Sequence, residues 1–180
     1  MEKRLASQPA RWYAVYTKAR FEKKVYNDLL LKGIECYLPL KKEKRQWSDR
    51  IKEVEEPLIR GYIFVRIKLK FYYDVLVVPG AISFVRFDNQ PAVIPDSQMA
   101  DLKLFMLHEA AQVNVTSERI SKGDIVRVID GPLKNVTGEV AQIRGRRRLL
   151  LRFRALGCCV YAEIGLNKIE TVKEECRKVG

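Results

Sequence analysis

Few side chains in this sequence could carry out catalysis or hold a metal ion. There is one histidine, His108, and there are four cysteines, Cys36, Cys158, Cys159 and Cys176. The cysteines lack the spacing of structural zinc sites, and Cys158 and Cys159 are adjacent in a predicted strand, where neighbouring side chains point to opposite faces. No glycine-rich phosphate loop and no paired carboxylates with a pocket signature occur. We therefore expect no enzyme, no metal and no cofactor, and free thiols in a reducing cytoplasm.

The charge of the chain is more informative than its reactive groups. Lys and Arg number 34 against 22 Asp and Glu, which gives a formal net charge of +12. Both halves are basic, and this predicts a salt-sensitive attraction to a polyanion such as nucleic acid. A basic protein without such a partner is the alternative. No apolar run approaches the ~20 residues of a membrane span, so we expect no membrane partner.

Residues 10–108 alternate between strand-like and helix-like patterns. In the first predicted helix, Phe21, Val25 and Leu29 recur at every fourth position, and Gly33 is placed to end it. The order of elements predicts an α+β fold, with a ferredoxin-like α/β sandwich in this half. The highly charged segment 41–57 is expected to be an extended hairpin or a loop. Strands are predicted at 11–17, 34–40, 58–68, 82–87 and 92–94, and helices at 19–33, 71–78 and 97–108.

The second half has strand patterns only. Residues 109–119 lack a core pattern and are predicted to be a linker. Glycines punctuate the runs that follow, as expected where a turn needs a positive φ or two backbones pass closely. Several short strands in succession predict a small SH3-like β-barrel over residues 120–173. The predicted strands are 124–129, 137–143, 147–153, 158–164 and 168–172.

Three segments and the glycine pattern together resemble a known family. RWYAVYT (11–17), FEKKV (21–25) and PLIRGYIFVRI (57–67) occur in the order found in the N-terminal (NGN) domain of the NusG family of transcription elongation factors. The stretch GDIVRVIDGPLKNVTGEVAQI (123–143) is similar to the KOW motif of the same family. The resemblance implies an NGN domain at 10–108, a linker at 109–119 and a KOW domain at 120–173. The residues that match the KOW motif are Gly123, Asp124, Val126, Val128, Gly131, Pro132 and Gly138.

Two other segments are similar to specialised paralogues within that family. GAISFVRFDNQPAVIP (80–95) resembles the matching stretch of RfaH, and QWSDR (46–50) resembles the capsule-operon, UpxY-like factors. This likeness implies a transcription antitermination factor that suppresses pausing and termination on specific polysaccharide or capsule operons. A general NusG-type elongation factor and a ribosome- or RNA-binding KOW protein are the alternatives.

The resemblance also implies a partner. The family's NGN domain docks on the coiled-coil clamp helices of RNA polymerase and bridges its cleft, which disfavours the open, paused enzyme. A few large aromatic contacts can anchor such an interface. The alternative is that the matching rings fill the sandwich core. The residues that match the polymerase-binding surface are Tyr16, Tyr62, Phe64 and Phe87.

Nucleic acid and further proteins are implied as additional partners. Lys18 and Lys24 match positions that contact the non-template DNA strand in the paralogue, and Arg20 and Lys23 are close to them in sequence. A solvated helix face is the alternative. For the KOW domain, the family implies ribosomal protein S10 or the termination factor Rho. We expect a monomer in the cytoplasm. A cationic run in that domain could serve an acidic partner or RNA, or keep a strand edge soluble: Arg144, Arg146, Arg147 and Arg148.

Overall fold

The computed structural model contains two compact units, Met1–Ala100 and Asp101–Gly180. The division passes through a long helix, α4 (Asp96–Glu109), close to the helix predicted at 97–108. The domain limits that follow from the resemblance stay a prediction. No helix in the described part of the chain is both long and apolar enough to cross a bilayer. The described residues are 9–46, 51–109, 113–116, 123–131, 133–143, 146–163 and 169–172.

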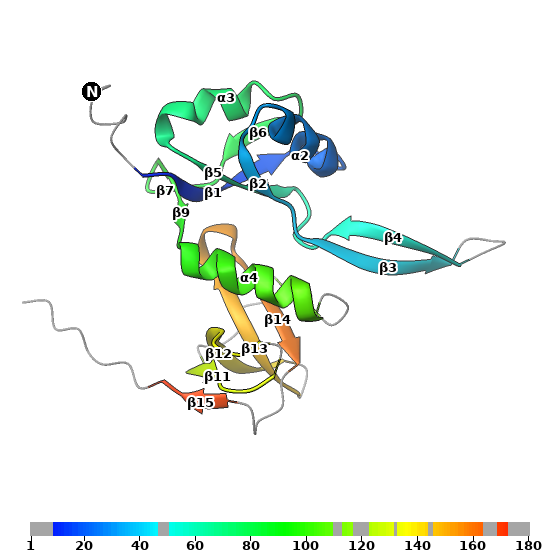
Figure 1. Cartoon of the computed structure of the whole chain (residues 1–180), viewed down its shortest axis with the longest axis vertical. Coiled ribbons are helices and arrows are strands. Elements are labelled where there is room, and N and C mark those ends of the chain that lie inside the picture. The colour runs from blue at the N-terminus through cyan, green and yellow to red at the C-terminus, as the bar shows by residue number, and fades with distance from the viewer. Residues whose placement is uncertain are drawn as a thin grey trace, which may run out of the picture. The chain divides into compact units, whose positions relative to one another are not determined.

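The first unit is built on an antiparallel sheet with strand order β2-β5-β1-β6, and the short strand β9 also pairs with β1 (Figure 1). Helices α2 and α3 follow β1 and β5 in the chain. This arrangement confirms the predicted α+β fold of this half. The elements are β1 (Arg11–Thr17), α2 (Glu22–Leu31), β2 (Glu35–Tyr37), β5 (Tyr62–Ile67), η1 (Leu69–Phe71), α3 (Tyr72–Leu76), β6 (Ala81–Phe84) and β9 (Val93–Ile94).

The core of this unit follows from the two sequence periodicities. On β1 and β5 alternate residues are buried in one cluster, and the apolar stripe of α2 joins them. Gly33 ends α2 as predicted: it has φ +70°, its N–H donates to Leu30 O, and the Ile34 N–H donates to Leu29 O at 3.0 Å. The fully buried members of the cluster include Val15, Val25, Leu29, Ile63, Val65 and Val75.

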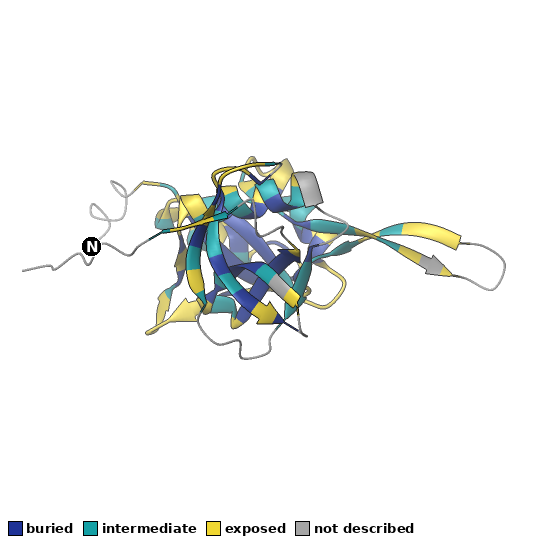
Figure 2. Ribbon diagram, turned by 90° about the horizontal axis from the view of Figure 1, so that it is seen from below, coloured by how far each residue is buried: buried dark blue, intermediate teal, exposed yellow. Residues whose placement is uncertain are grey.

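The charged segment 41–57 is a β-hairpin. Strands β3 (Leu40–Gln46) and β4 (Ile51–Pro57) pair only with each other and extend away from the rest of the first unit (Figure 1). Most of its described residues are exposed or half-buried (Figure 2). A two-stranded ribbon without a packed face is marginally stable by itself. Cross-strand charge pairs on so exposed a ribbon add only a little to its stability.

A second, shorter hairpin follows β6. Strands β7 (Arg86–Phe87) and β8 (Gln90–Pro91) are joined by Asp88 and Asn89, which have φ +48° and +61°. Two successive residues with positive φ make the turn type that fits the twist of a tight hairpin, and Asp and Asn tolerate it well. The predicted turn at these two residues is confirmed. The predicted strand 82–87 is interrupted at Val85.

The second unit contains a six-stranded antiparallel sheet with order β10-β14-β13-β12-β11-β15. Five strands match those predicted, and β10 lies inside the segment 109–119 predicted as a linker. The SH3-like barrel is not confirmed, because no ladder in the described part of the chain joins the end strands β10 and β15 into a closed sheet. The strands are β10 (Asn114–Thr116), β11 (Asp124–Val128), β12 (Thr137–Ile143), β13 (Arg146–Phe153), β14 (Cys158–Glu163) and β15 (Ile169–Thr171), with a turn of 3-10 helix, η2 (Arg154–Leu156).

Candidate functional site

Two tyrosines, one exposed and one half-buried, lie side by side at one end of the first sheet. Tyr16 on β1 is directly opposite Tyr62 on β5, and their ring centroids are 5.4 Å apart with planes tilted by 58°. Tyr16 is 44% exposed and Tyr62 is half-buried. Exposed aromatic surface of this kind is enriched at the anchoring points of protein interfaces. We call Tyr16 and Tyr62 the tyrosine pair.

The other two predicted docking residues lie elsewhere. Phe64 is on the same face of β5 as Tyr62 but has no exposed surface, which is what the core-filling alternative predicts. Phe87 is 70% exposed on the β7–β8 hairpin. The structure therefore brings together two of the four rings, and it presents a third from a separate element.

The backbone beside the tyrosine pair is a tight turn at Gly61. This glycine has φ +79°, and a Cβ placed on it would lie 3.2 Å from Tyr16 Cε2. Residues other than glycine rarely adopt that backbone conformation. Glycine is thus needed here both for the turn and for the space in which the Tyr16 ring lies.

Four predicted nucleic-acid-binding cations surround the start of α2. Their side chains are all exposed. The loop before the helix is held by two backbone hydrogen bonds, from Lys18 N–H to Gly80 O at 2.8 Å and from Phe21 N–H to Lys18 O at 3.0 Å. A cluster of exposed cations on this loop and the first turn of α2 suits a phosphate backbone better than a single specific anion. The four are Lys18, Arg20, Lys23 and Lys24.

The structure corrects one expectation in this region. Phe21 belongs to the predicted apolar stripe of α2, yet it precedes the helix and is 36% exposed. The ammonium of Lys24 lies 5.8 Å from the centre of its ring. A half-exposed ring between cations is the combination that single-stranded nucleic acid uses for stacking and phosphate attraction. Helical periodicity alone gives no signal that the ring is exposed, because it treats position 21 as part of the stripe.

Three cations of the long hairpin face carboxylates on the opposite strand. The register places Lys41, Lys42 and Lys44 on β3 opposite glutamates on β4. Lys42 Nζ lies 3.1 Å from Glu53 Oε1, and this contact raises the pKa of Lys42. The ribbon is therefore close to charge-neutral and is a weaker candidate for nucleic acid than the start of α2. Trp47 and Arg50 lie outside the described residues.

Two glycines of the KOW-like pattern occupy positions where a side chain cannot fit. A Cβ on Gly123 would overlap the carbonyl oxygen of Val140, and one on Gly138 would lie 2.6 Å from the carbonyl oxygen of Leu150. Strands β11, β12 and β13 therefore pass too closely for any other residue. Gly131 has φ +88°, as its predicted turn requires, and Pro132 lies outside the described residues.

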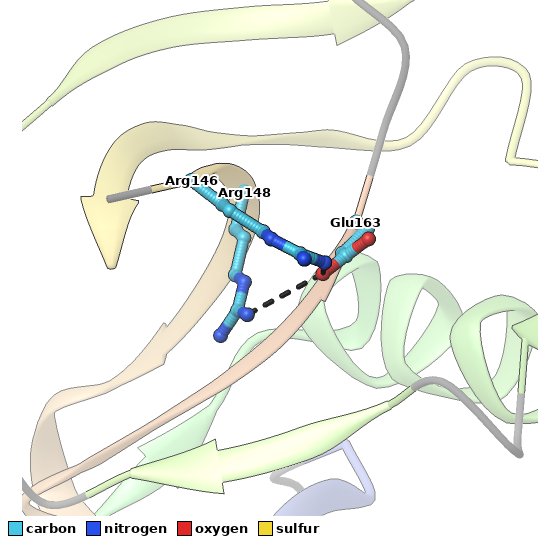
Figure 3. A network of polar contacts seen from close by, with 3 residues as sticks. All are labelled: Arg146, Arg148 and Glu163. Atoms are coloured by element: carbon cyan, nitrogen blue, oxygen red, sulfur yellow. Dashed lines mark hydrogen bonds and ion pairs between the residues drawn. The ribbon is translucent and has the colours of Figure 1, made fainter. Parts of the chain in front are cut away.

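Two arginines of β13 form ion pairs with the neighbouring strand β14. Arg146 donates to Glu163 Oε1 at 3.0 Å, and Arg148 reaches the same oxygen at 3.4 Å (Figure 3). The Arg148 guanidinium also lies 4.8 Å from the centre of the Tyr161 ring. Of these two arginines, Arg146 is the more exposed, at 71% of its side chain against 13% for Arg148. Arg144 and the side chain of Arg147 lie outside the described residues.

The thiols are poor candidates for chemistry. Cys36, Cys158 and Cys159 are free. Burial raises the pKa of Cys36 to about 11, with the charge of Glu35 adding to the shift, and it raises the pKa of Cys158 to about 11 as well. A thiol with so high a pKa is protonated at neutral pH and is a weak nucleophile. Among the described residues no three acidic, histidine or cysteine side chains form a metal-binding group; Cys176 and the His108 side chain are not among them.

Comparison with known families gives the class of protein. The family described as "Transcription termination factor nusG" matches residues 10–103, more than half of the chain. The chain belongs to the NusG family. Within that family it is a NusG-type transcription termination/antitermination factor.

Individual relatives are similar over nearly the whole length. The transcription termination/antitermination protein NusG of Rickettsia prowazekii (strain Madrid E) is 24% identical over 172 residues, which cover 89% of each chain. That of Lactococcus lactis subsp. lactis (strain IL1403) is 22% identical and covers 94% of this chain and 97% of its own. A solved structure of Thermotoga maritima NusG superposes with a TM-score of 0.51 at 22% identity, covering 91% of this chain and 98% of its own, and it supports the fold.

Proposed function

We propose that this factor binds RNA polymerase through the tyrosine pair and bridges the polymerase cleft. The observation that carries the proposal is the placement of the exposed Tyr16 ring beside the half-buried Tyr62 ring at the end of β1 and β5. A helical coiled coil offers apolar ridges, and an aromatic pair on a rigid sheet is a suitable dock for them. Phe87, exposed on its own hairpin, is proposed as a separate contact.

The proposed mechanism is a shift of population without covalent chemistry. A ligand that binds the closed polymerase more tightly than the open, paused form favours the closed form by that difference in affinity. The factor makes and breaks no bond in this scheme. Pausing and termination are suppressed because the paused conformation becomes less populated.

Binding of purified polymerase by the Tyr62→Ala protein tests the docking surface. Removal of an anchoring ring costs roughly 2 kcal/mol or more at an interface, so we expect about thirtyfold weaker binding. Leu31→Ala is the matched control, because Leu31 is an apolar residue 87% exposed on α2, outside the proposed surface. Full-strength binding by a folded Tyr62→Ala protein would refute the proposal.

We propose the non-template DNA strand as a second ligand, held by the cations at the start of α2. The supporting observation is that Lys18, Arg20, Lys23 and Lys24 are all exposed around one loop. Positive charge beside an exposed ring attracts single strands with little sequence preference. The second unit is proposed to contact ribosomal protein S10 or Rho, as the resemblance to the family's KOW domain implies.

We further propose a specialised role on polysaccharide or capsule operons. The support is the likeness of residues 46–50 and 80–95 to such paralogues. Transcription in vitro on templates with and without the natural operon leader separates this role from a general one. A specialised factor acts only on the leader template, whereas equal effects on both templates would identify a general elongation factor. Binding to ribosomal RNA without polymerase would favour the RNA-binding alternative.

A further inference from the structure

Glu22 is a carboxylate buried at the first turn of α2. Only 4% of this residue is exposed, although its neighbours Lys23 and Lys24 lie in solvent. Charged residues are rarely buried to this extent unless a partner compensates for the lost water. An acidic side chain in a first helical turn has no need of burial to interact with the helix dipole. Its position therefore indicates a specific partner.

That partner is the backbone of the Gly61 turn, 39 residues further along the chain. The Gly61 N–H donates to Glu22 Oε1 at 2.8 Å. The Gly61 carbonyl accepts from the Thr17 N–H, also at 2.8 Å. Both polar backbone groups of this glycine are thus fixed, one by the start of α2 and the other by the end of β1.

The Gly61 turn in turn determines where the two rings lie. Tyr62 follows Gly61 directly, and the Tyr16 ring occupies the space that a Cβ on Gly61 would crowd. A rotation of the Gly61 peptide would therefore displace Tyr62 and open or close the space beside Tyr16. A hydrogen bond to an ionised acceptor is about twice as strong as a neutral one, which suits it to holding a positive-φ turn.

We propose that Glu22 is a positioning residue for the polymerase-docking surface: its carboxylate holds Gly61 in the turn that sets Tyr16 and Tyr62 side by side. This inference rests on the proposed function of the tyrosine pair. The local sequence gives no sign of a special role for Glu22, because this residue begins a short run of charged side chains after Phe21. Only the contact across 39 residues assigns one.

Three variants of the full-length protein test the inference. Glu22→Gln and Glu22→Met remove the same charge and have similar length, but only Gln keeps an oxygen that can accept from the Gly61 N–H. Asp28→Ala removes a half-buried carboxylate from the same helix that makes no contact with Gly61 in the described hydrogen bonds. We expect Glu22→Met to bind polymerase about tenfold more weakly, Glu22→Gln to bind within about threefold of the unaltered protein, and Asp28→Ala to bind equally well.

The Gly61 amide gives a readout that does not depend on polymerase. In nuclear magnetic resonance spectra of the unaltered protein and of Glu22→Gln, its proton should exchange slowly with water. In Glu22→Met it should exchange faster and shift upfield, while the amides of the β1–β5 ladder keep their protection. Should Glu22→Met fail to fold, the affinity of Glu22→Gln and the exchange of Gly61 in the unaltered protein decide the matter.

The two proposals fail in different ways. If Tyr62→Ala weakens binding and a folded Glu22→Met does not, the positioning role is wrong and the docking surface stands. A loss of tenfold or more in Glu22→Gln also overturns the positioning role, since the acceptor is retained. If Tyr62→Ala binds at full strength, the docking surface is wrong. Fast exchange of Gly61 in the unaltered protein overturns the Glu22 contact itself.

Discussion

Arg152 and Glu139 form a bidentate ion pair that joins strands β13 and β12. Arg152 Nε donates to Glu139 Oε1 at 3.0 Å, and Arg152 Nη2 donates to Oε2 at 2.8 Å. The Gly123 N–H also hydrogen-bonds to this carboxylate. Their side chains are only 24% and 10% exposed. Glu139 thus links the first glycine of the KOW-like pattern to the third strand of the sheet, a stronger arrangement than a surface ion pair.

Removal of the arginine should destabilise the second unit. Arg152→Met leaves the Glu139 carboxylate partly buried without its cation, and we expect a loss of about 1–3 kcal/mol in the free energy of unfolding. Arg146→Met is the matched control: it breaks an ion pair in the same strand that is largely exposed to solvent, so a much smaller loss is expected. Urea unfolding followed by circular dichroism measures both. Equal losses would show that the pair contributes no more than a surface contact.

The same pair predicts how stability depends on acid. The hydrogen bond from Arg152 holds the pKa of Glu139 below its usual 4.5. The unfolded chain therefore takes up the proton at a higher pH than the folded chain does. This contribution to stability is fully present above pH 4.5 and is lost as the pH falls through the lower, folded pKa. We expect Glu139→Gln to be less stable than the unaltered protein at neutral pH. Its free energy of unfolding, measured from roughly pH 6 down to pH 3, should fall less steeply with acid. An unchanged slope would contradict the assignment.

For Asp101 we expect stability to depend on pH in the opposite direction. Burial raises the pKa of this carboxyl from 3.8 to about 6. The folded protein therefore holds the proton more tightly than the unfolded chain, and the associated stability is present at low pH and lost as the pH rises through about 6. Asp101→Asn should stabilise the protein by about 1–3 kcal/mol at neutral pH and much less in acid. Asp74→Asn, at an exposed carboxylate, is the control and should change neither value.

Two glycine-to-alanine substitutions distinguish the loss of stability caused by steric crowding from the loss caused by backbone strain. Gly123→Ala forces a methyl group against the Val140 carbonyl, and we expect a loss of about 3 kcal/mol or more, or no folded second unit. Gly33→Ala meets no atom within 4 Å and suffers only from its φ of +70°, so about 1–2 kcal/mol is expected. Thermal unfolding compares the two. A smaller effect at Gly123 than at Gly33 would mean that the strands separate easily.

The proposed single-strand surface predicts a change in salt dependence. Lys24→Gln should reduce the slope of log affinity against log salt concentration by about 0.7, the value for one phosphate contact to a single strand. Lys42→Gln is the matched control, because Lys42 is already paired with Glu53. Titration of a labelled single-stranded oligonucleotide at several salt concentrations measures the slopes. The same slope for Lys24→Gln and the unaltered protein would exclude a phosphate contact at Lys24.

The local structure of this protein could be predicted from its sequence. Alternation along residues 11–17 identifies β1 and separates Tyr13 and Val15 from the opposite face. Apolar residues at every fourth position identify α2, and Gly33 marks its end. Both signals depend on residues only a turn or two apart in the helix. The same holds for the Asp88–Asn89 turn, where the side chains themselves favour the backbone conformation.

The surfaces, by contrast, were decided by tertiary structure. Strand periodicity places Tyr62 and Phe64 on one face, but only packing leaves the first half-exposed and buries the second. Helical periodicity assigns Phe21 to the core stripe, although the helix begins one residue later and the ring remains partly in solvent.

The strand at Asn114–Thr116 exists through its pairing with β14, and the contact between Glu22 and Gly61 spans 39 residues. A short-range pattern specifies whether a segment is a helix or a strand, and which of its side chains share a face. What covers each face is determined by residues far away in the chain, so exposure, strand order and the buried carboxylate's partner emerge only when those residues are brought together.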